Sequence, residues 1–215
     1  MSNLIDNEIN ALHKEVIRMG TLCEDAINNA TTALLENDKN SAEVAIRLEE
    51  EINEKEREIE DLCLTFLLKQ HPVARDLRKI SATLKMLTDL ERIGDQARDI
   101  AEIVQTHDLT SYCNNPHISD LANSTSSMVN NIISAHVKND MLMCEQVIVS
   151  DTVVDNLFEK VKNDIIEMIQ KDTTIAEDAL FLLMIAKYYE RIGDHATNIA
   201  EWVEFSITGK HRNDN

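Results

Sequence analysis

The stretch Glu91-Arg92-Ile93-Gly94-Asp95 occurs a second time in this chain, as Glu190-Arg191-Ile192-Gly193-Asp194. The two copies begin 99 residues apart in a chain of 215 residues. Each copy is followed by a further polar residue four positions after its aspartate, Asp99 in the first and Asn198 in the second. A long-range echo of this kind indicates an internal duplication, and its acidic residues are the first candidates for a functional site.

The repeat extends well beyond this stretch. The pattern Ala26-Ile27-Asn28-Asn29 with Asn37-Asp38 recurs 102 residues later as Met128-Val129-Asn130-Asn131 with Asn139-Asp140. The offset falls to 99 by Glu91, so three residues, close to one helical turn, were gained or lost in between. We therefore expect two similar units at residues 1–107 and 117–215, joined by a polar linker at 108–116.

The composition favours helices. The chain holds only 4 Gly, 2 Pro and 4% aromatic residues, whereas strands favour aromatic and β-branched residues and hairpins favour Gly. Short connections make neighbouring helices antiparallel, so we expect an all-α fold of two tandem three-helix bundles. The His71-Pro72 step is predicted to end one helix, with Pro72 at the first position of the next. The expected helices are 3–36, 41–69, 73–106, 117–138, 141–170 and 174–208.

The charge and the cysteines exclude several classes of function. A net charge of −18 argues against a nucleic-acid-binding face, which needs clustered Lys and Arg, and against docking on an anionic membrane. No apolar run reaches the roughly 20 residues of a membrane span, and no signal peptide opens the chain. The four cysteines are widely spaced, which is typical of reduced cytosolic thiols. We expect a cytoplasmic protein without membrane insertion.

The acids of the echo lie on one face of a helix. At about 100° per residue, Glu91, Asp95 and Asp99 fall within roughly 80° of arc, as do Glu190, Asp194 and Asn198; Glu102 and Glu201 share these faces. Like charges at i,i+4 destabilise a helix by a few tenths of a kcal/mol per pair. A bound cation would turn this repulsion into coordination, and oxygen-rich sites suit Mg²⁺, Ca²⁺, Mn²⁺ and iron.

One helix cannot surround an ion, so a neighbouring helix must contribute. Asp151 and Asp155 lie one predicted helix upstream of the second echo, and Glu49 and Asn53 hold the equivalent positions in the first unit. We expect these pairs to face the echo helices. Gly94 and Gly193 indicate close approach of a helix or ligand, since a mid-helix Gly costs roughly 0.5–1 kcal/mol relative to Ala. The alternative is a metal-free scaffold whose acidic faces are solvated.

Other chemistry finds little support in the residues. None of the seven histidines follows a Glu at the E-x-x-H spacing of di-iron helical bundles, which counts against a carboxylate-bridged iron or manganese enzyme. Gly-rich phosphate loops and nucleophile motifs are absent from the sequence. A non-catalytic protein is therefore expected, and a carboxylate-bridged metal enzyme or a metal-storage bundle stays as the alternative.

The longer motifs resemble one known family. Pro72-Val73-Ala74-Arg75-Asp76-Leu77-Arg78, Asp89-Leu90-Glu91-Arg92-Ile93-Gly94-Asp95 and Glu190 to Glu201 are similar to the PhoU family, as is Thr208-Gly209-Lys210 near the end. The resemblance covers nearly the whole chain. It implies two PhoU-type three-helix bundles in a cytosolic accessory regulator of the phosphate-specific ABC transporter, with a homodimer as a weaker expectation.

The resemblance also implies partners, cofactors and ligands. The partners would be the transporter ATPase subunit and a phosphate-sensing histidine kinase, with negative control of the phosphate-starvation response. The cofactors would be multinuclear clusters of iron, zinc, manganese or magnesium held by E/D-x-x-x-D pairs. Carried onto this chain, site one comprises Glu49, Asn53, Glu91, Asp95 and Asp99, and site two comprises Asp151, Asp155, Glu190, Asp194 and Asn198. An asparagine replaces one carboxylate in each site.

Overall fold

The computed structural model describes residues 2–70, 72–113 and 116–212, and these residues form six long α-helices and one short 3₁₀ helix, without strands. The expectation of an all-α fold is confirmed. The helices are α1 (Ser2–Glu36), α2 (Lys39–Gln70), α3 (Ala74–Thr106), α4 (Pro116–Lys138), α5 (Met141–Lys171), η1 (Thr173–Ile175) and α6 (Ala176–Thr208). None of these helices combines the length and the apolar character needed to cross a bilayer.

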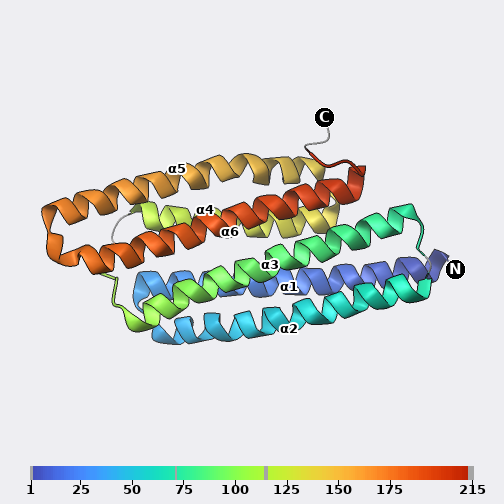
Figure 1. Cartoon of the computed structure of the whole chain (residues 1–215), viewed down its shortest axis with the longest axis horizontal. Coiled ribbons are helices and arrows are strands. Elements are labelled where there is room, and N and C mark those ends of the chain that lie inside the picture. Colours follow the sequence, from blue (N-terminus) through green and yellow to red (C-terminus); the bar gives the residue numbers. More distant parts are fainter. Residues whose placement is uncertain (1, 71, 114–115, 213–215) are drawn as a thin grey trace.

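The helices form two antiparallel three-helix bundles that lie side by side (Figure 1). Helices α1, α2 and α3 pack together, as do α4, α5 and α6, and the two bundles meet through α3 against α6 and α1 against α4. The turn between α2 and α3 lies at one end of the elongated molecule, and the turn between α5 and α6 lies at the other (Figure 1). Equivalent segments of the repeat therefore point in opposite directions.

The first turn of each bundle is built in the same way. Asn37 and Asn139 adopt positive φ values of 54° and 51°, a conformation that Asn tolerates better than most residues. The aspartate after each caps the following helix: Asp38 accepts from the backbone N–H of Asn40, and Asp140 accepts from that of Leu142. Capping satisfies N–H groups that have no partner within the helix, so this dipeptide ends one helix and begins the next.

The second turns differ between the bundles. Helix α3 begins at Ala74 with Val73 as its N-cap, so Pro72 lies before the cap and the prediction that it occupies the first helical position is wrong. His71 lies outside the described residues. In the other bundle, the Asp172 side chain accepts from the Thr174 N–H and caps η1, which precedes α6. The helix expected at residue 174 therefore begins with a 3₁₀ turn.

The core is aliphatic, and the two glycines of the echo mark close helix contacts within each bundle. A Cβ added at Gly94 would lie 2.9 Å from Cδ1 of Ile52 on α2, and one added at Gly193 would lie 3.2 Å from Cγ1 of Val154 on α5. These glycines thus let α2 approach α3, and α5 approach α6, more closely than any other residue would allow. All four cysteines are buried and free, in agreement with reduced thiols.

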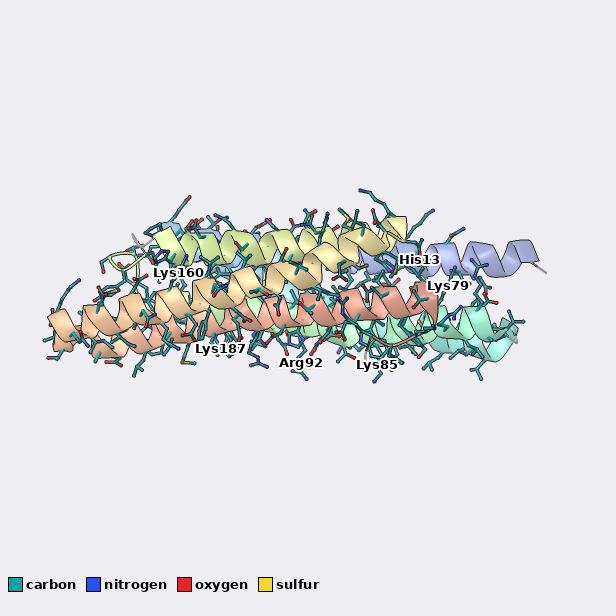
Figure 2. All side chains as sticks on the ribbon, turned by 90° about the horizontal axis from the view of Figure 1, so that it is seen from above. His13, Lys79, Lys85, Arg92, Lys160 and Lys187 are labelled. Atoms are coloured by element: carbon teal, nitrogen blue, oxygen red, sulfur yellow. The ribbon has the colours of Figure 1, made fainter. Side chains whose placement is uncertain are left out.

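A pair of histidines, one buried and one half-buried, joins the bundles away from the acidic helices. Nδ1 of His13 on α1 lies 2.9 Å from Nε2 of His136 on α4. Burial lowers the pKa of His136 to about 3, with a smaller contribution from His13. Burial and the Lys79 ammonium lower the pKa of His13; Figure 2 shows Lys79 near it. Both rings are therefore neutral near pH 7.

Candidate metal centres

The first acidic cluster lies between α2 and α3. Glu49 on α2 is buried, and Glu91 and Asp95 on α3 are half-buried. Burial raises the pKa of Glu91, and the carboxylates of Asp95, Glu56 and Glu49 raise it further. The acids of α2 thus lie close enough to those of α3 to repel them, as the spacing of the residues predicted.

Two arginines partly neutralise the carboxylates of this first cluster, and an amide donates a hydrogen bond to one of them. Arg92 donates from Nη1 to Oδ2 of Asp95 at 2.9 Å, and its Nε lies 3.3 Å from Oε2 of Glu91. Asn53 donates from Nδ2 to Oε1 of Glu49 at 2.6 Å, and Nη1 of Arg98 lies 3.7 Å from the same oxygen. The Asn53 amide oxygen is buried without a hydrogen-bond partner, so this oxygen is available to coordinate a metal ion.

The second acidic cluster lies between α5 and α6. Burial raises the pKa of Asp151 to about 6, and the nearby carboxylates of Asp155, Asp194 and Glu190 contribute, partly offset by the Thr197 hydroxyl. Burial also raises the pKa of Asp194, followed by repulsion from Glu190, while Lys187 lowers it. All four predicted carboxylates of this site therefore influence one another.

Asp151 lies beside the glycine of the second echo. Its Oδ1 is buried and has no hydrogen-bond partner. The same oxygen would lie 3.4 Å from a Cβ at Gly193, so the glycine leaves space beside it. Across the cluster, Lys187 donates to Glu190 and its Nζ lies 5.4 Å from the ring centroid of Phe158. Figure 2 shows Lys187 and Arg92 on the same side of the molecule.

The structure places Asp99 and Asn198 on the seam between the bundles. Asn198 on α6 donates from Nδ2 to Oδ1 of Asp89 on α3 at 3.1 Å, and Nδ1 of His195 lies 2.9 Å from the same oxygen. On the equivalent side, a hydrogen bond from Tyr188 on α6 lowers the pKa of Asp99, although burial and the neighbouring acids raise it overall. The last residue of each predicted set therefore faces the other bundle rather than α2 or α5.

Sequence reasoning missed Glu56. It lies on α2, seven residues after Glu49, and therefore on the same helix face. Burial raises its pKa, Glu60 and Asp95 raise it further, and the guanidinium groups of Arg57 and Arg92 oppose this. Its spacing from Glu49 was a usable signal, but it was hidden in a run dominated by acidic residues.

The donor chemistry of both clusters fits a hard cation, because oxygen ligands that repel one another gain most from a shared positive charge. The unpartnered oxygens of Asp151 and Asn53 support this fit. As placed, however, no three His, Cys, Asp or Glu side chains of the described residues are arranged to hold an ion. Ion binding would require these carboxylates to turn inward from their arginine and lysine partners.

Comparison with known proteins decides the family. The model of the PhoU domain family matches residues 16–104 and 118–203, one match in each bundle. The chain belongs to the PhoU family. The two matches follow the duplication, and the structure has two three-helix bundles in tandem.

Relatives match this PhoU-family chain over almost its whole length. It is 33% identical over 214 residues to the phosphate-specific transport system accessory protein PhoU homolog of Clostridium acetobutylicum, covering 96% of this chain and 95% of that protein. The Synechocystis homolog is 34% identical over 209 residues, covering 95% and 92%. The crystal structure of PhoU from Pseudomonas aeruginosa has a TM-score of 0.87 at 27% identity, covering 95% of this chain and 99% of that one. The regulatory protein PhoU from Streptococcus pneumoniae, with a TM-score of 0.89 at 24% identity and coverage of 97% and 99%, shares the fold.

Proposed function

We propose that this chain is a cytosolic regulator of phosphate uptake and of the phosphate-starvation response. The observation that carries this proposal is the match of both bundles to one family, with relatives of the same length named as accessory proteins of phosphate transport. The role is that of an adaptor, which contacts the transporter ATPase subunit and a phosphate-sensing histidine kinase and restrains the starvation response, as a homodimer. The relatives' names describe accessory proteins and not enzymes.

The adaptor holds metal ions at its two acidic clusters. In the first cluster, Glu49, Glu91 and Asp95 supply carboxylates and Asn53 supplies its amide oxygen. In the second, Asp151, Asp155, Glu190 and Asp194 supply carboxylates. Bound cations would neutralise these groups and fix the spacing of α2 to α3 and of α5 to α6. The buried, unpartnered Oδ1 of Asp151 supports this use of the second cluster.

Metal analysis of the purified protein tests the cofactor. We expect bound iron, zinc, manganese or magnesium, and loss of that metal in the double variant Asp95→Ala, Asp194→Ala with unchanged helicity by circular dichroism. Asp61→Ala is the matched control, because Asp61 is an exposed acid outside both clusters. Metal content that is equal in the double variant and the wild type would refute the assignment of these residues.

Deletion of the chain in its host tests the regulatory role separately. Phosphate-scavenging genes should become expressed in high phosphate, and the wild-type chain should restore their repression. The double variant Asp95→Ala, Asp194→Ala then separates the two parts of the proposal: if it restores repression fully, the adaptor acts without its metals. Unaltered gene expression in the deletion strain would overturn the regulatory role itself.

A further inference from the structure

The two hairpin tips of the molecule carry opposite charge. The tip formed by residues 62–70 and 72–79, at the end of α2 and the start of α3, contains four Lys or Arg and one Asp, and is therefore net +3 in a chain of net −18. The equivalent tip at residues 164–181, where α5 meets α6, contains one Lys and five Asp or Glu, and is net −4. The two tips lie at opposite ends of the molecule (Figure 1). The acidic average of the chain thus conceals one basic hairpin tip, which lies at the same end of the molecule as the start of α1 (Figure 1).

The basic tip also exposes large apolar side chains. Leu68 is 81% exposed, Val73 67% and Leu77 45%. A hollow of about 130 Å³ between α1 and α2 is lined by Glu8, Ala11, Leu12, Leu62, Thr65 and Phe66. Leucines left in water at the end of a helical hairpin cost free energy that burial in a partner would recover. Three such side chains within one hairpin turn are candidates for an interaction surface.

The cations of the tip divide into two groups. Lys69 and Arg75 are exposed and flank the apolar residues in the sequence. Arg78 and Lys79 lie further back, where Arg78 packs against Gly209 and Lys79 lies near His13. The outermost part of the tip is therefore a small apolar surface flanked by two positive charges.

The size of the tip distinguishes a lipid surface from a protein partner. Each helix is about 10 Å across, so the end of a two-helix hairpin offers on the order of a few hundred Å², well below the roughly 800 Å² per partner of a stable protein interface. A membrane needs less contact, because each Lys or Arg is attracted to anionic headgroups and each apolar side chain gains by entering the interfacial layer.

The direction of the tip keeps the acidic body away from the membrane. Helix α2 has 32 residues and is therefore about 48 Å long, whereas charges are screened beyond about 8 Å at physiological ionic strength. We propose that the tip at residues 62–70 and 72–79 docks end-on against the headgroup layer of an anionic lipid membrane, through Leu68 and Val73 between Lys69 and Arg75. No helix crosses the membrane in this arrangement. The exclusion of an anionic membrane, which rests on the whole-chain charge, does not apply to this end.

Vesicle co-sedimentation tests this proposal with the full chain, and its outcome does not depend on metals or on the regulatory role. We expect binding to vesicles of mixed phosphatidylcholine and phosphatidylglycerol at low salt, and no binding to vesicles of phosphatidylcholine alone. The double variant Lys69→Glu, Arg75→Glu should lose binding by about tenfold or more. Leu68→Ser with Val73→Ser should weaken it several-fold, and high salt should weaken the wild type.

Matched controls come from the acidic tip. Leu180→Ser removes an apolar side chain of similar exposure, and Lys171→Glu reverses an exposed charge; both should bind as the wild type does. Circular dichroism melting shows whether each variant is folded. The proposal is overturned if the wild type ignores mixed vesicles at low salt, if Lys69→Glu, Arg75→Glu binds equally well, or if the controls lose as much binding. Failure to bind vesicles would assign the tip to a protein partner instead.

Discussion

The acidic clusters of the two bundles occupy equivalent places in the repeat but are neutralised in different ways. In the first, Arg92 contacts both Glu91 and Asp95, and Arg98 lies near Glu49. In the second, Lys187 pairs with Glu190, while Asp151 keeps a buried oxygen without a partner. The first cluster is thus more nearly balanced by its own cations than the second.

The comparison shows which features of the repeat the two units share and which differ between them. The residues that set the distance between helices are preserved, because Gly94 faces Ile52 as Gly193 faces Val154. The residues that balance charge diverged. Where the first unit has Glu56 and Thr88, the second has Phe158 and Lys187 at the equivalent positions. At these two positions the second unit has one carboxylate fewer and one cation more, whereas Asp155 stands where the first unit has Asn53. The two sites therefore share their helix packing but differ in the placement of their charges.

The largest expected difference concerns the frame. Gly94→Val should destabilise the protein by about 3 kcal/mol, because its Cβ would lie only 2.9 Å from a fully buried Ile52. Gly193→Val should cost about 1–2 kcal/mol, since the nearest atom, on Val154, is 3.2 Å away. Denaturant unfolding measures both. Equal costs would show that the two helix pairs are packed alike and that the clusters differ in charge alone.

The sequence predicted the frame well because helical periodicity and internal repetition are local signals. The echo of five residues located α3 and α6, and the acids one helix upstream located the faces of α2 and α5. Two features could be recognised only from the way in which the two bundles pack against each other. Asp89 and Tyr188 sit on the seam that α3 and α6 share, and nothing in the spacing of Asp99 or Asn198 tells that these residues turn toward it.

Three further features were harder to interpret from the sequence. Glu56 stood within an acid-rich run, so its position on the face of Glu49 gave no contrast. Arg75, Arg78 and Lys79 are readable in the sequence as a basic patch near a helix start. The sequence did not show that this patch lies with exposed Leu68 and Val73 at one end of the molecule. Pro72 lies two residues before Ala74, the first residue of α3, because Val73 takes the N-cap position. The general preference of Pro for the first helical position does not reveal this.

The second-largest expected effect concerns the contact between α1 and α4 at His13 and His136. It also makes stability depend on pH, so it must be known before the two acidic clusters are compared at different pH. The folded-state pKa of His136 is about 3, below the roughly 6.5 of an unfolded chain. The unfolded state therefore binds the proton more readily, and stability falls as pH falls below about 6.5. We expect a loss of about 2 kcal/mol between about pH 7 and about pH 5. In denaturant unfolding, His136→Gln should reduce the fall of the free energy of unfolding over this pH range. If the variant loses as much stability as the wild type, His136 is not the cause of the pH dependence.

The smallest effect compares the clusters directly, in protein freed of metal by a chelator. The folded pKa of Asp151 is about 6, above the roughly 3.9 of an unfolded chain, so this carboxylate destabilises the fold near pH 7. The shift corresponds to about 3 kcal/mol, and solvent screening of a partly exposed group reduces this to about 1 kcal/mol. Asp151→Asn should therefore stabilise the metal-free protein by about 1 kcal/mol near pH 7.

The pH dependence of that gain identifies its origin. Because the folded state holds the Asp151 proton more tightly, the wild type regains this stability as pH falls through about 6, so the advantage of Asp151→Asn should shrink there, opposite in sign to the His136 limb. Glu91→Gln should gain less, because Arg92 already contacts Glu91. An equal gain in the free energy of unfolding from the two variants would mean that the arginines of the first cluster neutralise its acids no better than the lysine of the second. The charge difference between the two clusters would then have no effect on stability.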